Sequence, residues 1–236
     1  AGLLLYEILH DAGLPVGVVN FITGPGRTVG EELITHPDVS GFIFTGSKAV
    51  GLDILHRFNQ PRHRPCIVEM GAKNPAIVMP SANLDDATEG VLRSAFGLGG
   101  QKCSACSRLY LHRNIYQPFL DMLVEKTRKL VIGDPVKRET FLGPLINEAA
   151  VARYEGAIRL GRKEGRVLHG GKRLKEFAHG FFVEPAIIER APKSSRLFQD
   201  ELFVPVLAVA EIKSLDEAIL LANDSEYGLT AGIFSR

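Results

Sequence analysis

The sequence has few cysteines, almost no net charge and no long apolar stretch. Its three cysteines, Cys66, Cys103 and Cys106, are too few for a disulfide framework and indicate a reducing compartment, the cytoplasm or, in a eukaryote, the mitochondrial matrix. The 28 lysines and arginines nearly balance the 27 aspartates and glutamates, and no basic run occurs, so we expect no nucleic-acid partner. No run of about 18 uninterrupted apolar residues exists, so we predict no association with a membrane.

Helical and strand-like patterns alternate along the 236 residues. Helices are predicted over residues 1–12, 27–35, 47–58, 83–98, 115–130, 147–164 and 215–222. Strands are predicted over residues 16–22, 40–45, 65–69, 75–79, 108–112, 181–186, 204–212 and 229–234, and loops over 133–144 and 191–203. This alternation is typical of parallel strands joined by right-handed crossovers, and the continuous apolar strands indicate a sheet covered on both faces. We therefore predict an α/β fold.

Both ends of the sequence interrupt a regular pattern. The chain begins inside a helical pattern without a capping residue, and it stops at Ser235-Arg236 directly after an apolar strand. We therefore expect a fragment of a longer protein.

The stretch from Gly100 to Arg108, GQKCSACSR, carries the strongest chemical signal. Small, flexible residues flank Cys103 at the end of a helical pattern, where a thiol can be exposed for nucleophilic attack. Glu69 lies upstream, at the end of an apolar strand and shortly before two small residues. A thiol and a carboxylate at such corners can act as nucleophile and general base in acyl chemistry. Cys103 and Glu69 are therefore the candidate catalytic residues.

Cys103 and Cys106 also form a Cys-x-x-Cys pair, for which three other interpretations stay open. A zinc ion needs about four ligands. No second cysteine pair exists and the nearest histidine, His112, falls in a predicted strand, so we expect no metal site. A thioredoxin-like dithiol is the second interpretation, and a pair of buried, inert cysteines is the third.

Two glycine-containing turns each follow a predicted strand and precede a predicted helix. The first contains Gly24, and the second contains Thr45, Gly46 and Ser47. Glycine lets the backbone approach a ligand closely, and a helix N-terminus favours phosphate. Two such turns in one parallel sheet indicate a nucleotide site at the carboxyl ends of the strands. The alternatives are an ordinary turn at Gly24 and a helix cap at Ser47.

An acidic turn precedes the predicted strand over residues 204–212. It contains Glu201 and Phe203 within the sequence QDELFVP. A carboxylate in such a position can bind the hydroxyls of a ribose. The alternative is a solvated turn without a ligand.

These motifs occur in an order that resembles the aldehyde dehydrogenase superfamily over essentially the whole sequence. The matching motifs are Gly24-Pro25-Gly26, Phe44-Thr45-Gly46-Ser47, Glu69-Met70-Gly71-Ala72-Lys73, Gly100-Gln101-Lys102-Cys103, Asp200-Glu201-Leu202-Phe203-Val204-Pro205 and Glu226-Tyr227-Gly228-Leu229. Within the superfamily, the stretch GQKCSACSR looks most similar to the 1-pyrroline-5-carboxylate dehydrogenases. These enzymes oxidise glutamate semialdehyde to glutamate in proline breakdown.

The resemblance implies an NAD-dependent oxidation of an aldehyde to a carboxylic acid, with NADP as a possible cofactor. Cys103 would attack the aldehyde carbon to form a thiohemiacetal and then a thioester. Glu69 would activate the water that hydrolyses the thioester. Ser104 would bond the carboxylate of glutamate γ-semialdehyde, the expected substrate.

The resemblance also implies which residues hold the cofactor. Ser47 would lie near the diphosphate, Glu201 would bind the nicotinamide-side ribose, and Phe203 would pack near the nicotinamide. Thr45 and Gly46 would shape the same pocket. Gly24 belongs to a matching motif and is also a candidate cofactor residue.

The superfamily's fold implies a division of the chain within a three-layer sandwich with a parallel sheet. Residues 1–70 would form the C-terminal part of a Rossmann-like NAD-binding domain, and residues 71–236 the catalytic domain with the nucleophilic cysteine. The full-length parent would be a homo-oligomer that acts on a small-molecule aldehyde, and the isolated fragment would be inactive. The alternatives are another semialdehyde or aliphatic aldehyde dehydrogenase, a cofactor-independent thiol hydrolase, and an inactive scaffold-type relative.

Overall fold

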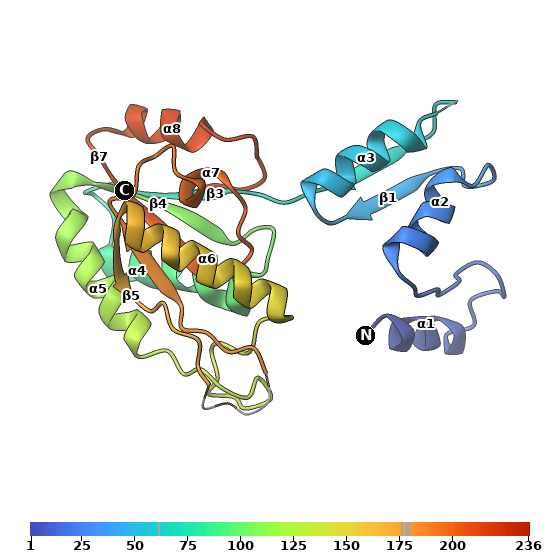
Figure 1. Ribbon diagram of the computed structural model, residues 1–236, viewed down its shortest axis with the longest axis horizontal. Coiled ribbons are helices and arrows are strands. Elements are labelled where there is room, and N and C mark those ends of the chain that lie inside the picture. The colour runs from blue at the N-terminus through green and yellow to red at the C-terminus, as the bar shows by residue number, and fades with distance from the viewer. Residues whose placement is uncertain (61, 176, 178–179) are drawn as a thin grey trace. The chain divides into compact units, whose positions relative to one another are not determined.

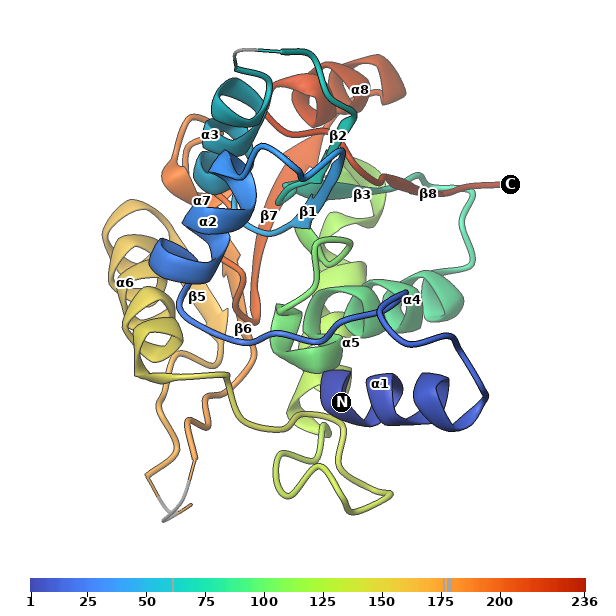
Figure 2. The ribbon, with the colours of Figure 1, turned by 90° about the vertical axis from the view of Figure 1, so that its right-hand side faces the viewer.

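The computed structural model describes residues 1–60, 62–175, 177 and 180–236. The chain divides into two units, Ala1–Met70 and Gly71–Arg236, which are drawn in two views in Figure 1 and Figure 2. Over the described ranges, no helix is both long enough and apolar enough to cross a lipid bilayer.

The first unit is built around two short parallel strands. Strand β1 (Phe42–Thr45) pairs with β2 (Cys66–Glu69), and the register sets Thr45 opposite Glu69. The helices of this unit are α1 (Gly2–Asp11), a π-helix (Gly26–Gly30), α2 (Glu31–Thr35) and α3 (Lys48–Phe58). Its buried core is small and consists of Ile34, Ile54 and Phe58.

The predicted strand over residues 16–22 is wrong. All seven of these residues are described, and they form turns and irregular backbone. Gly17 has a φ of 87°, a left-handed conformation that interrupts an extended run. The β-branched residues favoured a strand, but a strand persists only where a neighbouring strand satisfies its backbone groups. The predicted helix over residues 27–35 is divided between the π-helix and α2.

The second unit contains a six-stranded sheet in the order β5-β6-β7-β4-β3-β8. Its strands are β3 (Asn74–Val78), β4 (Cys106–His112), β5 (Arg166–His169), β6 (Ala186–Glu189), β7 (Val206–Ile212) and β8 (Gly232–Phe234). Every neighbouring pair is parallel except β5 and β6, which are antiparallel. The predicted α/β fold is therefore confirmed, with one antiparallel edge strand on a parallel sheet.

Helices cover both faces of this sheet (Figure 1). Helices α4 (Leu84–Phe96) and α5 (Tyr116–Arg128) pack on one face, and α6 (Glu148–Glu164), α7 (Arg196–Gln199) and α8 (Leu215–Asn223) pack on the other. Neighbouring strand residues point to opposite faces. Leu109 and Leu111 accordingly join the α4–α5 core, whereas Tyr110 joins the α6–α8 core.

Three local predictions in the second unit are wrong. The strand expected over residues 181–186 begins only at Ala186, where the chain pairs with β7. Strand β5 was missed because its four residues, RVLH, follow a helix directly and show no alternation. Helix α7 lies inside a predicted loop; Ser195 caps it by accepting a hydrogen bond from the Leu197 N–H at 3.1 Å. The other predicted elements agree with the structure to within a few residues.

Candidate active site

Cys103 is exposed in a turn that leads into β4. The turn follows a 3-10 helix (Gly97–Gly100), in which Leu98 and Gly100 have φ angles of 53° and 65°. A Cβ atom at position 100 would lie 2.7 Å from the Val204 carbonyl oxygen, so only glycine fits there. The fold thus forces a strained turn that keeps the thiol at the surface.

Asn74 fixes the same turn from the start of β3, where it is only 3% exposed. Its Nδ2 donates to the carbonyl oxygens of Cys103 at 2.7 Å and Ala105 at 3.0 Å, and its Oδ1 accepts from the Thr230 N–H at 3.0 Å. A buried amide with three good partners is a rigid support. No role was predicted for Asn74 from the sequence, although a polar residue at the start of an apolar strand is the signal that could have found it.

The two neighbouring cysteines differ in their surroundings. Cys103 and the adjacent Ser104 are exposed, whereas Cys106 is 5% exposed and its Sγ donates to the Arg108 carbonyl oxygen at 3.5 Å. Burial raises the pKa of the Cys106 thiol to about 12, which makes it unreactive. An exposed thiol beside a buried one does not suit a redox dithiol. Within the described ranges, no group of three or more His, Cys, Asp or Glu side chains could hold a metal ion.

Glu201 lies beside the Cys103 turn. Its Oε1 accepts a hydrogen bond from the Ala72 N–H at 2.9 Å, and its carboxylate packs against Gly71, where a larger residue would displace it. Glu201 and Gly100 line the same narrow cleft. The carboxylate is therefore held in one orientation next to the thiol-bearing turn.

Phe203 borders both the narrow cleft and a wider apolar cavity of about 690 Å³. The cavity is lined further by Leu98 and Gln101, which precede the Cys103 turn, and by Ile146, whose N–H donates to the Gln101 Oε1 at 3.0 Å. Phe203 has a φ of 54°, a conformation that costs a residue other than glycine about 1–3 kcal/mol. Such strain is tolerated where the surrounding packing imposes it, and it is frequent at functional sites.

Thr45, Gly46, Ser47 and Glu69 gather at the carboxyl ends of β1 and β2 in the first unit. The Gly46 N–H donates to the Glu69 carbonyl oxygen at 3.0 Å, and the Ser47 Oγ accepts from the Val50 N–H at 3.5 Å. Ser47 thereby begins α3 as a cap, the role that the sequence analysis held open for it. The structure brings the predicted general base and three predicted cofactor residues together at one corner.

The N-terminus of α3 suits a phosphate group. The helix has eleven residues and no acidic residue in its first turn, whereas α4 and α8 each begin with two acidic residues. The positive end of its dipole is therefore not compensated by a side chain of that turn. The positive end of such a dipole favours an anionic group such as phosphate.

Gly24 lies in a different turn of the first unit. The Thr28 and Val29 N–H groups both donate to the Pro25 carbonyl oxygen at 3.0 Å and close that turn. The helix that follows is a five-residue π-helix and not the predicted α-helix. The geometric case for a phosphate at Gly24 is therefore weaker than the case at Gly46.

The profile of the aldehyde dehydrogenase family matches residues 1–236. The chain belongs to the aldehyde dehydrogenase family. The family expected from the ordered motifs is thereby confirmed.

Relatives within the aldehyde dehydrogenase family agree with this assignment. The 1-pyrroline-5-carboxylate dehydrogenase 1 of Halalkalibacterium halodurans is 41% identical over 235 residues, which are 98% of this chain and 45% of that protein. The 1-pyrroline-5-carboxylate dehydrogenase of Geobacillus kaustophilus is 40% identical over the same shares. The chain thus spans about half the length of the curated relatives that it matches.

Solved structures show the same fold. The structure of a 1-pyrroline-5-carboxylate dehydrogenase from Thermus with bound NAD matches with a TM-score of 0.92 and 40% identity, over 98% of this chain and 45% of that one. A γ-glutamyl-γ-aminobutyraldehyde dehydrogenase from Burkholderia cenocepacia matches with a TM-score of 0.95 and 36% identity, over 99% of this chain and 47% of that one.

Proposed function

We propose that this chain carries the thiol, the general base and part of the cofactor site of an enzyme that oxidises an aldehyde to a carboxylic acid with NAD(P)⁺. The observation that supports this most directly is the exposed Cys103 in a turn fixed by Gly100 and Asn74. Because the chain spans about 45% of its relatives, the activity is proposed for the chain joined to the rest of such an enzyme.

Cys103 acts as the nucleophile. Its sulfur forms a bond to the carbonyl carbon of the aldehyde, and the carbonyl oxygen takes up the displaced electron pair, giving a thiohemiacetal. NAD(P)⁺, when bound, supplies the acceptor for the hydride that this carbon must lose. Loss of the hydride and of the hydroxyl proton leaves a thioester on Cys103.

Glu69 acts as the general base of the second half-reaction. Its carboxylate takes a proton from water, and the resulting hydroxide attacks the thioester carbon. The carbon–sulfur bond breaks and the carboxylic acid leaves. The sulfur departs as a thiolate, and the proton that Glu69 took from water is released to restore the thiol of Cys103. Glu69 belongs to the first unit and Cys103 to the second, so their cooperation is part of the proposal.

The cofactor residues come from both units. Gly46 and Ser47, at the uncompensated N-terminus of α3, would bind the diphosphate. Glu201, oriented by the Ala72 N–H, would accept hydrogen bonds from ribose hydroxyls. Phe203 would pack against the nicotinamide ring, and Thr45, which directly precedes Gly46, would also contact the cofactor.

The proposed substrate is glutamate γ-semialdehyde. Several relatives at about 40% identity are named 1-pyrroline-5-carboxylate dehydrogenase, and Ser104, exposed next to Cys103, can donate a hydrogen bond to the carboxylate of such a substrate. The alternatives are other semialdehydes and aliphatic aldehydes. We also propose that the whole enzyme is a homo-oligomer of the cytoplasm.

A chimera tests the reaction. This chain replaces the corresponding segment of the Halalkalibacterium halodurans relative, and formation of the reduced cofactor is followed with a panel of semialdehydes and aliphatic aldehydes. We expect turnover with glutamate semialdehyde and a loss of roughly a thousandfold or more in Cys103→Ser, but not in the matched Cys106→Ala variant. Preference for uncharged aldehydes would contradict the role of Ser104.

The reactivity of the Cys103 thiol can be tested with this chain by itself. Iodoacetamide at neutral pH should label Cys103 far faster than Cys106, as read by peptide mass spectrometry. A sluggish Cys103 would favour an inactive scaffold-type relative. Hydrolysis of thioesters by the chimera without any affinity for NAD would favour a thiol hydrolase.

A further inference from the structure

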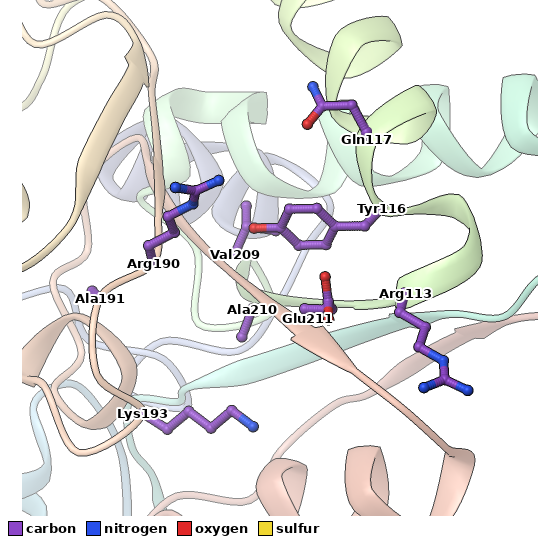
Figure 3. A pocket seen from close by; sticks show the side chains of 9 residues that line it. All are labelled: Arg113, Tyr116, Gln117, Arg190, Ala191, Lys193, Val209, Ala210 and Glu211. Atoms are coloured by element: carbon purple, nitrogen blue, oxygen red, sulfur yellow. The ribbon is translucent and has the colours of Figure 1, made fainter.

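A cavity of about 520 Å³ lies at the other end of β4 from the Cys103 turn (Figure 3). Cys103 precedes β4, whereas Arg113 and Tyr116, which line the cavity, follow it. Arg190 and Lys193 enter from the segment after β6, and Val209 to Glu211 of β7 complete the lining. None of these residues takes part in the proposed dehydrogenase site.

The chain topology opens a crevice at this place. β4 and β7 are adjacent and parallel, but the chain leaves β4 into α5 on one face of the sheet and leaves β7 into α8 on the other. Where successive connections depart to opposite faces, a crevice forms outside the carboxyl ends of the two strands. Ligands of open α/β sheets bind preferentially in such crevices.

A buried carboxylate holds two of the lining residues in place. Glu189, 1% exposed at the end of β6, accepts a hydrogen bond from the Tyr116 hydroxyl at 2.9 Å and from the Arg166 Nε at 2.7 Å. The Nε of Arg190 lies 3.4 Å from the same carboxylate. Burial and the bond to Glu189 raise the pKa of Tyr116, which therefore stays protonated. The wall of the cavity is preorganised before any ligand arrives.

The lining has an excess of positive charge. The lining contains three cationic side chains and one carboxylate: Arg113, Arg190 and Lys193 against Glu211. Lys193 already pairs with Glu217 at 2.9 Å and Arg190 with Glu189 at 3.4 Å, but the Arg113 side chain makes no ion pair or hydrogen bond with any residue that the structure describes, so the excess charge rests on Arg113. An unneutralised guanidinium beside a cavity attracts carboxylate or phosphate.

The cationic side chains lie on two sides of the cavity. Figure 3 shows Arg190 and Lys193 on one side and Arg113 on the other, with the ring of Tyr116 between them. Val209 packs on the α4–α5 face and Ala210 on the α6–α8 face, and both add apolar atoms at the base of the crevice. This arrangement matches a short ligand with an anionic group at each end and a hydrocarbon link between them.

We propose that the cavity binds a small organic dianion, at a site separate from the thiol. The shared chemistry is two negative groups held by Arg113 on one side and by Arg190 and Lys193 on the other. A dicarboxylate and a phosphorylated carboxylic acid both satisfy it. The inference does not depend on the dehydrogenase reaction.

Isothermal titration calorimetry of the 236-residue chain tests the site, with glutarate and 3-phosphoglycerate as probes that carry an anionic group at each end, the phosphate ester adding further charge, and acetate as the monoanion. We expect saturable 1:1 binding of at least one dianion, weaker binding at higher salt, and no saturation by acetate. Tighter binding of glutarate would identify the second anionic group as a carboxylate, and tighter binding of 3-phosphoglycerate would identify it as a phosphate.

The decisive variant is Arg113→Gln, because this exposed side chain has no partner whose loss could disturb the fold. We expect it to weaken dianion binding by about tenfold or more, and Arg138→Gln, an exposed control in the loop after α5, to leave it unchanged. Circular dichroism confirms the folding of each variant.

Three results would overturn the site. One is the absence of saturable binding by both dianions. Another is equal affinity of Arg113→Gln and the unchanged chain. The third is binding that Arg113→Gln retains and Ser47→Ala loses, because the anion would then lie at the N-terminus of α3.

Discussion

The two units are built on parallel strands, but their strands are buried to very different extents. In the second unit, β3 and β6 are buried along their whole length, and large apolar clusters lie on both faces of the sheet. In the first unit, β1 and β2 alternate half-buried and exposed residues, and Ile43 and Ile67 are 76% and 55% exposed. Parallel strands are normally covered on both faces. The turn of Cys103 is therefore attached to strands that are buried on both faces, whereas Glu69 and Ser47 follow strands that remain partly exposed.

Two arginines, one in each unit, provide the strongest test of this difference in burial. Arg108, 1% exposed, donates to the Leu221 and Ala222 carbonyl oxygens at 3.1 and 2.8 Å and thus ties the end of α8 to the sheet. Arg64 is half-buried in the first unit and donates to the Phe58 carbonyl oxygen at 3.0 Å. Both side chains satisfy backbone groups at helix ends, but only one is fully removed from water.

We expect Arg108→Met to lower the free energy of unfolding of the second unit by about 3–4 kcal/mol, because the buried Lys73 carbonyl oxygen and the part-buried Leu221 and Ala222 carbonyl oxygens lose their donor. Arg64→Met should cost the first unit about 1–2 kcal/mol, since water can replace part of the lost bonding. Urea unfolding with hydrogen exchange read separately in β1–β2 and β4–β7 measures both. The exposed Arg138→Met is the control, and equal losses in the two units would contradict the comparison.

Asn74→Ala should give the next largest effect. It leaves the Cys103 and Ala105 carbonyl oxygens without their amide donor, which should cost about 2–3 kcal/mol. The matched variant in the first unit is Asn59→Ala, whose Nδ2 donates to the half-buried Leu55 carbonyl at 3.2 Å, with an expected cost of about 1 kcal/mol. Iodoacetamide labelling of Cys103 should change in Asn74→Ala alone. Unchanged labelling would show that Asn74 does not position the thiol.

Lys73 should make stability depend on pH. The side chain is 2% exposed, its Nζ has no hydrogen-bond partner among the described residues, and burial together with the charge of Arg108 lowers its pKa to about 7. An unfolded lysine has a pKa of about 10.4. Between these values the unfolded state binds more protons, so the free energy of unfolding should rise with pH, by up to about 1.4 kcal/mol per unit.

Urea titrations between about pH 7 and 8.5 measure this slope. Below pH 7 both states carry the proton and the dependence on Lys73 disappears. Cys106 acts in the opposite direction as the pH approaches the pKa of an unfolded thiol, about 8.5, so the lower part of this range gives the cleanest slope. Lys73→Met should abolish the slope and the exposed Lys137→Met should keep it. A slope that persists in Lys73→Met would assign it to another group.

The smallest effects should come from the helix caps. Ser47→Ala in the first unit and Ser214→Ala in the second each remove one acceptor for a helix N–H, and each should cost about 1 kcal/mol. Only Ser47→Ala should also weaken NAD binding by the chimera, as measured by fluorescence of the reduced cofactor. Equal cofactor affinity in both variants would remove Ser47 from the proposed diphosphate site.

The sequence predicted long elements well and short ones poorly. Helices α5 and α6 have sustained apolar periodicity and well-defined ends, and both agree with the structure. β5 could not be found because four residues contain too little pattern, and its place at the sheet edge is set by pairing with β6. Residues 16–22 have strand-like composition, but pairing decides whether such a run becomes a strand.

The candidate site shows the same limit. The order of its motifs was enough to predict the family, and the local sequence predicted the exposed turn of Cys103. The contrast with Cys106 could not be predicted, because it depends on β4 turning its first residue into the core. Asn74 was missed because its three partners come from segments far apart in the chain, which only the folded structure brings together.

The contact between Gly100 and the carbonyl of Val204 has a mechanical consequence. A methyl group at position 100 would collide with that oxygen, so a larger residue there would have to push the thiol-bearing turn and the Phe203 segment apart. The two segments lead into β4 and β7, which are paired in one sheet, and this pairing sets the separation between them. The proposed substrate would have to fit that separation.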